Sequence, residues 1–224
     1  LKPGRGEGGA SYDELVATEG RPRLRYWLDR ILAEGMLDAS VAYGYFPVVA
    51  EGDDVVVLHH GDDPAGLLGT PGLIAPDGAS GGQVGSDRLR FSFPRQRRDR
   101  HLCLSDFVRS RESGVIDLMP VQPVTAWAHV DSVTAALFKR YAYRVYFELH
   151  GLVMQLTEAL AEYWHARIRA ELGFAGEEPT EVEGLFKLDY RGGRFSRGYP
   201  ACPDMEDRRK VVELLRPERL GVEL

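Results

Sequence analysis

The stretch Arg194-Phe195-Ser196-Arg197-Gly198-Tyr199-Pro200-Ala201-Cys202-Pro203-Asp204 decides how the last part of the chain is built. Pro200 and Pro203 lack backbone N–H donors and fix φ, so the stretch is neither a helix interior nor a central strand. A stiff, irregular segment exposes backbone groups that a ligand can use. Arg194 and Tyr199 suit a small molecule with a carboxylate and a flat ring. An ordinary connector before a final helix is the alternative interpretation.

The same residues carry a family resemblance. Arg-x-x-x-Gly-Tyr-Pro-Ala-Cys-Pro-Asp resembles the S-adenosylmethionine-binding signature of the activation domain of cobalamin-dependent methionine synthase. Three other stretches are similar to the same family, at residues 43–54, 102–107 and 156–169. The resemblance extends over residues 11–220, which is most of the chain.

The resemblance implies a methyltransferase module that works in methionine biosynthesis. In this family, inactive cob(II)alamin is reductively methylated: flavodoxin or another reductase supplies an electron, and S-adenosylmethionine supplies the methyl group. The implied ligand is S-adenosylmethionine, and the implied cobalamin is carried by a partner, the cobalamin-binding domain. Because Co(I) is the nucleophile, the chain is expected to position reactants and to contribute no catalytic residue.

The resemblance also implies which residues bind the ligand. They lie in the signature and on a long helix: Arg194, Gly198, Tyr199, Pro200, Ala201 and Glu158. Arg194 is expected to clamp the carboxylate in bidentate fashion, and Glu158 to balance the positive charges. Leu188 departs from the family, which often has a glutamate six residues before the motif arginine. The fragment is expected to hold only part of the family's pocket.

Composition limits the classes of partner. A length of 224 residues allows one large domain or two small ones, and 44% hydrophobic residues supply a core. A net charge of −6 argues against nucleic-acid binding, and no apolar run is long enough to span a membrane. Cys103 and Cys202 indicate neither a disulfide framework nor a zinc site. We expect a cytoplasmic protein without a metal site.

Hydrophobic periodicity predicts an α+β fold. We expect a single domain with a central twisted, mostly antiparallel sheet and flanking helices, one of them long. Residues 1–10 read as a linker, and residues 11–224 as the activation domain, truncated at both ends. The expected elements are a capped turn at Ser11, a helix at 24–32 ended by Gly35, strands at 41–49, 55–58, 89–94 and 114–121, a broken helical region at 132–173 capped by Asp131, a short helix at 182–188, and a last helix ending at Leu215.

The long helix has an apolar and a polar stripe. The apolar stripe contains Val145, Leu149, Leu152, Val153, Leu156, Leu160, Tyr163 and Ile168. Glu158, Glu162, His165 and Arg169 follow one another at spacings of four, three and four residues, which makes them neighbours on the helix surface. A solvent-facing charge is the favoured interpretation of Arg169.

Two polar regions leave alternatives open. The basic cluster of Arg95, Arg97, Arg98 and Arg100 is a solvated face or, less favoured, a docking patch for an acidic partner. Residues 60–87 are rich in glycine but lack a lysine at the Walker spacing, which favours a surface insertion over a phosphate loop. Two other functions stay open: an interaction module that has lost ligand binding, and an unrelated metabolite-binding domain whose glycine loop holds phosphate.

Overall fold

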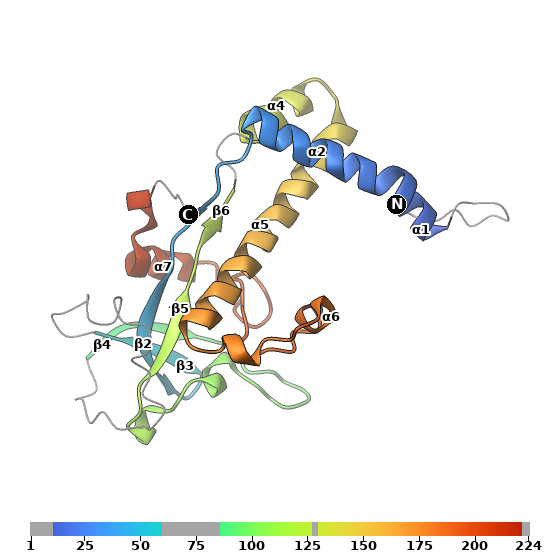
Figure 1. The fold of residues 1–224 in the computed structure, drawn as a ribbon. Coiled ribbons are helices and arrows are strands. Elements are labelled where there is room, and N and C mark those ends of the chain that lie inside the picture. Colours follow the sequence, from blue (N-terminus) through green and yellow to red (C-terminus); the bar gives the residue numbers. More distant parts are fainter. Residues whose placement is uncertain (1–10, 60–85, 127–129, 221–224) are drawn as a thin grey trace. The chain divides into compact units, whose positions relative to one another are not determined.

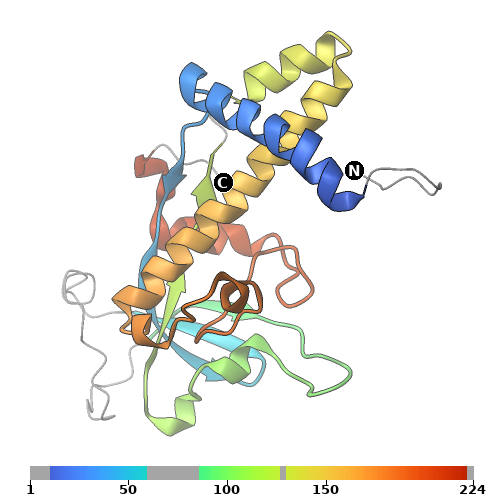
Figure 2. The same ribbon diagram turned by 45° about the vertical axis from the view of Figure 1, so that its right-hand side comes forward.

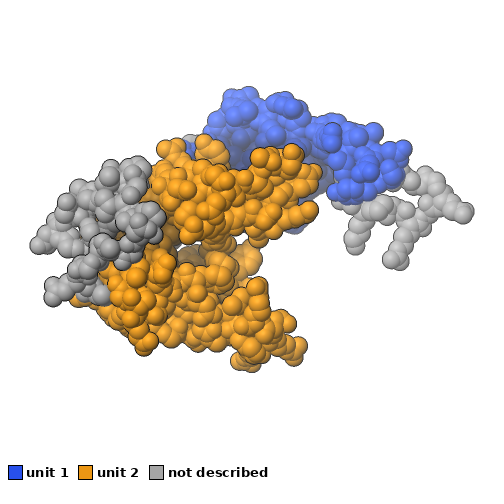
Figure 3. Space-filling model, turned by 60° about the horizontal axis from the view of Figure 1, so that its bottom comes forward, with its two compact units in different colours: residues 1–40, 124–160 blue, residues 41–123, 161–224 orange. Residues whose placement is uncertain are grey.

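The computed structural model describes residues 11–59, 86–126 and 130–220. These residues form the α+β fold predicted from the sequence, with an antiparallel sheet and one long helix (Figures 1 and 2). The chain divides into two compact units, residues 1–40 with 124–160 and residues 41–123 with 161–224 (Figure 3). The expected linker, nearly all of the glycine-rich insertion and the last four residues lie outside the described residues.

The first unit is helical. It contains α1 (Tyr12–Leu15), the π-helical turn η1 (Val16–Gly20), α2 (Arg21–Glu34), α4 (Val130–Lys139) and the first part of α5 (Tyr143–Glu171). Ser11 and Glu14 form the predicted capping box, with the Ser11 hydroxyl accepting from the Glu14 backbone N–H at 3.2 Å. Gly35 ends α2 with a φ of 57°, a left-handed conformation that glycine adopts without a Cβ clash.

The core of the first unit lies between α2 and α5. Its buried side chains are Trp27, Ile31, Met36, Val130, Leu149 and Val153, none of them more than 5% exposed. The predicted break in the helical region is confirmed, since α4 ends at Lys139 and α5 begins at Tyr143. Asp131 lies inside α4 rather than before it, because that helix already begins at Val130.

The second unit is built on a four-stranded antiparallel sheet in the order β4-β3-β2-β5. The strands are β2 (Gly44–Glu51), β3 (Asp54–Leu58), β4 (Asp87–Ser92) and β5 (Asp117–Val121). The predicted hairpin is confirmed: Glu51 pairs with Asp54 across a tight turn. Pro47 is tolerated in a central strand because the β3 ladder begins only at Val48. Two short strands, β1 (Ser40–Val41) and β6 (Val124–Thr125), lie where the chain crosses between the units.

Both faces of this sheet are covered, which explains its unbroken valine runs. On one face, Val48, Val55, Val57 and Phe91 pack in one cluster with Val211, Leu214 and Leu215 of α7 (Asp207–Leu215). Cys103 and Cys202 join the same cluster at 3% exposure, so Cys103 is the small buried hydrophobe expected from the sequence. Val49, Val56 and Leu58 form a separate buried cluster.

The remaining elements are short. They are the 3₁₀ turns η2 (Leu104–Phe107), η3 (Arg111–Ser113), η4 (Ala175–Glu177) and η5 (Pro217–Leu220), and the helix α6 (Val182–Phe186). Residues 190–204 contain no helix or regular strand, as the prolines of the signature predicted. No helix in the described ranges has both the length and the apolar character needed to cross a membrane.

Candidate functional site

The first arginine of the signature contacts the C-terminal half of the long helix. Arg194 donates from Nε and Nη2 to Oε1 of Glu162, at 3.0 and 2.7 Å. Its Nη1 donates to the Ser196 hydroxyl at 3.0 Å. The Arg194 side chain is 20% exposed and that of Glu162 47%. The contacts therefore fix the plane of the guanidinium while solvent still reaches the pair.

A buried polar cluster lies next to this pair on the same helix. Arg169, only 4% exposed, donates from Nε and Nη2 to the Glu178 carboxylate at 2.5 and 2.9 Å. Its guanidinium also lies 3.8 Å from the centre of the Tyr190 ring. The solvent-facing interpretation of Arg169 is wrong, because the chain folds back after α5 and supplies a bidentate carboxylate that compensates the buried charge.

His165 belongs to the same cluster and is neutral. Arg169 Nη1 lies 2.8 Å from His165 Nδ1, and a guanidinium can only donate, so Nδ1 accepts and the proton is on Nε2. Burial, and then the charge of Arg169, lower the pKa of His165. Oε2 of Glu162 lies 3.6 Å from the same Nδ1 and acts in the opposite direction.

The second arginine of the signature has a different set of partners. Arg197 Nη1 donates to Oδ2 of Asp207 at 2.8 Å, and the Asp207 side chain is only 3% exposed. Lys210 pairs with the other carboxylate oxygen at 2.7 Å. The Arg197 guanidinium also lies 4.6 Å from the centre of the Phe91 ring. These contacts anchor the signature to α7 and to the sheet.

Between the arginines and α7 the signature closes into a tight loop. Gly198 N donates to Cys202 O at 3.0 Å, and Cys202 N donates to Tyr199 O at 2.9 Å. Gly198 has a φ of 89°, a conformation that favours glycine, and a Cβ there would lie 2.9 Å from the sulfur of the flexible Met205 side chain. Tyr199, Pro200 and Ala201 form the tip, with Tyr199 62% exposed. The loop therefore offers backbone and an aromatic ring to solvent from a fixed base.

A cluster of one glutamate, one arginine and two tyrosines joins the end of α5 to β2 and to Tyr43, the residue before that strand. The hydroxyls of Tyr43 and Tyr45 donate to Glu171 at 3.2 and 2.6 Å, and Arg167 donates to the same carboxylate at 3.1 Å. Burial, and then the hydrogen bond to Glu171, raise the pKa of Tyr45. Both hydroxyls thus remain protonated donors, and their role is structural.

Comparison with known proteins identifies the family. Residues 23–224 match the family described as vitamin B12 dependent methionine synthase, activation domain. The chain belongs to this family. It is 51% identical to methionine synthase of Mycobacterium tuberculosis, over 100% of this chain and 18% of that protein. It is 50% identical to methionine synthase of Mycobacterium leprae, over 99% of this chain and 18% of that protein. The chain thus spans less than a fifth of these relatives.

A solved structure supports the same assignment. The crystal structure of the MetH reactivation domain bound to AdoHcy matches with a TM-score of 0.73 and 26% identity. The match covers 96% of this chain and 64% of that chain. The resemblance drawn from the signature is therefore confirmed at the level of family and fold.

Most of the predicted site residues of this activation domain belong to one continuous stretch of sequence, residues 194–201. Arg194 begins it, and Gly198, Tyr199, Pro200 and Ala201 form its loop. Glu158 is exposed on α5, within the first unit. Leu188, where the family often has glutamate, is 65% exposed with a φ of 57°.

The sequence pattern did not single out the Glu162 and Asp207 carboxylates as partners of the two signature arginines. Glu162 could have been found from its place in the polar row of the long helix. Asp207 gave no such signal, because its pairing with Arg197 depends on how α7 folds back. In the described residues, no group of three or more His, Cys, Asp or Glu side chains is placed to hold a metal ion.

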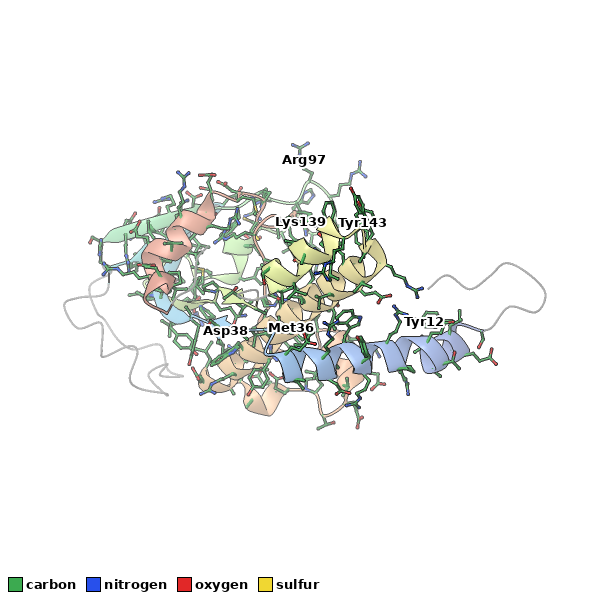
Figure 4. All side chains as sticks on the ribbon, turned by 90° about the horizontal axis from the view of Figure 1, so that it is seen from above. Tyr12, Met36, Asp38, Arg97, Lys139 and Tyr143 are labelled. Atoms are coloured by element: carbon green, nitrogen blue, oxygen red, sulfur yellow. The ribbon has the colours of Figure 1, made fainter. Side chains whose placement is uncertain are left out.

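The basic loop of the activation domain divides into two parts. Arg95 is held by Asp53 and Asp106, each with an N–O distance of 2.7 Å, and its hydrogen bonds lower the pKa of Asp106 to about 2. Arg97, Arg98 and Arg100 are exposed, and no side-chain hydrogen bond or ion pair of theirs is found in the described part of the chain. Figure 4 shows Arg97 pointing outward. The cluster thus contains one structural arginine and three solvated ones.

Proposed function

We propose that this activation domain binds S-adenosylmethionine at its signature and presents the sulfonium methyl group to a cobalamin carried by a partner domain of methionine synthase. The observation that carries the proposal is the setting of Arg194: an oriented, solvent-accessible cation at the start of a rigid loop with exposed backbone. The related MetH domain bound to AdoHcy, the demethylated form of the same ligand, supports the ligand class.

Each part of the proposed site has a chemical role. Arg194 takes the ligand carboxylate through charge-assisted hydrogen bonds. The backbone of 195–201 meets the adenine edge and the ribose, and Tyr199 packs on the ligand or lines the face that meets the corrin. Glu158 offsets the positive charge of the ammonium and sulfonium groups. Cobalamin, when bound on its own domain, supplies the nucleophile, so this chain contributes orientation and no acid–base or nucleophilic residue.

The proposed partners follow from the reaction. The cobalamin-binding domain must meet the signature loop, and an electron donor, flavodoxin or another reductase, must reach the complex. Arg97, Arg98 and Arg100 form a cationic surface in a chain of net charge −6, and this surface is proposed to dock an acidic electron donor. The module belongs to a methyltransferase and is proposed to act in the cytoplasm.

Calorimetric titration of the chain with S-adenosylmethionine, AdoHcy and ATP tests the proposal against its alternatives. We expect binding of the first two and none of ATP. Binding of ATP alone would favour a metabolite-binding domain with a phosphate loop. Binding of none of the three would favour an interaction module that has lost its ligand.

A further inference from the structure

We infer that Glu162 is a positioning residue: it holds the Arg194 guanidinium in the orientation that receives the ligand's carboxylate. The inference rests on the proposed function and adds a residue to it. Glu162 accepts two hydrogen bonds along the Nε–Nη2 edge of Arg194, while Ser196 accepts one from Nη1. Contacts at both ends of a planar group fix its plane.

The chemistry of the ligand makes that plane important. A carboxylate binds a guanidinium best when the two planar groups are coplanar and two parallel N–H···O bonds form. An arginine has a long side chain with much rotamer freedom, and ordering it on binding weakens affinity. Glu162 restricts Arg194 before the ligand arrives, so less order has to be imposed during binding.

The Glu162–Arg194 pair is not explained by a contribution to the stability of the fold. At 47% exposure for Glu162 and 20% for Arg194, such an ion pair contributes little to folding. The signature is already anchored elsewhere, by the Arg197–Asp207 pair and by the Cys202 thiol, which donates to Ser196 O at 2.8 Å. What the Glu162–Arg194 pair adds is the orientation of Arg194.

Glu162 itself stands on a rigid base. His165 and Arg169 follow it on the same face of α5, and both are buried. Arg169 is fixed by Glu178 and by the Tyr190 ring, and it donates to His165, which therefore stays neutral. A neutral His165 accepts at Nδ1 and does not compete with Arg194 for the Glu162 carboxylate.

Two ligands and a double-mutant cycle test the inference. Glu162→Gln, Arg194→Ala and the double variant are titrated with S-adenosylmethionine and with its decarboxylated form. We expect Glu162→Gln to weaken S-adenosylmethionine binding about threefold to tenfold, because the neutral amide oxygen holds the Arg194 guanidinium less firmly than the carboxylate does. Binding of the decarboxylated ligand should stay within about twofold, and Glu162→Gln should cause no further loss in the Arg194→Ala background.

Glu177→Gln is the matched control, because Glu177 pairs with Arg191 at 3.3 Å in the same unit and both side chains are more than half exposed. It should leave both affinities unchanged. Thermal unfolding of every variant separates binding effects from folding, and the Arg194 ¹⁵Nε signal should show faster side-chain motion in Glu162→Gln.

Several outcomes would overturn the inference. An equal loss for both ligands, or a loss that persists in Arg194→Ala, would mean that Glu162 acts directly or structurally. Unchanged affinity would show that Arg194 needs no partner, and tighter binding would show that Glu162 competes with the ligand. A wild-type chain that binds no S-adenosylmethionine would overturn the proposed function and this inference with it.

Discussion

Arg194 and Arg197 lie three residues apart in the signature, yet their surroundings differ. The partner of Arg194 is Glu162, with a side chain 47% exposed, whereas the partner of Arg197 is Asp207, 3% exposed. Removing one member of a buried pair leaves an uncompensated charge, whereas an exposed pair contributes little. The two arginines are themselves almost equally exposed, at 20% and 19%, so the difference lies in their partners: Arg197 compensates a buried carboxylate and Arg194 an exposed one.

The largest expected effect is a loss of stability when the Arg197–Asp207 pair, which anchors the signature, is broken. Arg197→Ala leaves the buried Asp207 carboxylate with Lys210 as its remaining ion-pair partner among the described residues, and we expect a loss of about 3 kcal/mol in unfolding free energy. Urea denaturation measures it. Arg209→Ala is the control, because Arg209 pairs with Glu206 and both are largely exposed. A loss no larger than that of Arg209→Ala would remove the distinction between the two sides.

At the proposed ligand-binding arginine, Arg194→Ala should have the opposite effect: it should weaken ligand binding and change stability little. Loss of a charge-assisted contact should weaken S-adenosylmethionine binding by about 1.5–3 kcal/mol. Stability should change by less than about 1 kcal/mol, because the pair is partly exposed. Calorimetric titration and thermal unfolding of the same samples measure both. Unchanged affinity would remove Arg194 from the site.

A smaller effect concerns pH and the cluster next to Arg194. The folded-state pKa of His165 is lowered, so in the pH range just below its ordinary value of about 6.5 the unfolded chain binds more protons. His165 therefore makes the protein less stable as pH falls through that range. His165→Asn keeps an acceptor near the position of Nδ1 and cannot titrate, so it should lose less stability between about pH 7.5 and 5.5. Denaturation at each pH measures these losses. Equal losses in the wild type and in His165→Asn would show that His165 is not held neutral.

The smallest effect is expected at the basic loop, because its exposed arginines neither anchor the signature nor belong to the proposed ligand site. Arg97→Glu with Arg98→Glu should leave folding unchanged and slow association with an acidic electron donor such as flavodoxin, most clearly at low salt. Stopped-flow measurement at two ionic strengths tests this, with the exposed Arg25 of α2, changed to Glu, as control. An association rate that changes with neither the mutations nor the ionic strength would leave only the solvated-face interpretation.

Much of the fold was predictable because local chemistry determines it. The Ser11–Glu14 capping box, the end of α2 at Gly35 and the hairpin before Asp54 all depend on neighbours in sequence. The apolar stripe of α5 was also right in its main members, since Leu149 and Val153 are fully buried. The prediction that Tyr163 belongs to the buried stripe was wrong, because its side chain is 65% exposed. An apolar stripe marks one face of a helix, but it does not show how much of that face is covered by other elements.

The sequence by itself determined the family and the irregular course of the signature, because prolines, glycines and a motif act through residue identity and spacing; it also gave the proposal that Arg194 is the cation that binds the ligand. Only the tertiary structure decided which carboxylate each arginine meets. Arg169 read as a surface charge, and it is buried because Glu178 returns to it after the helix. Burial of a charge depends on a partner brought back by the fold, and helical spacing by itself carries no information about that partner.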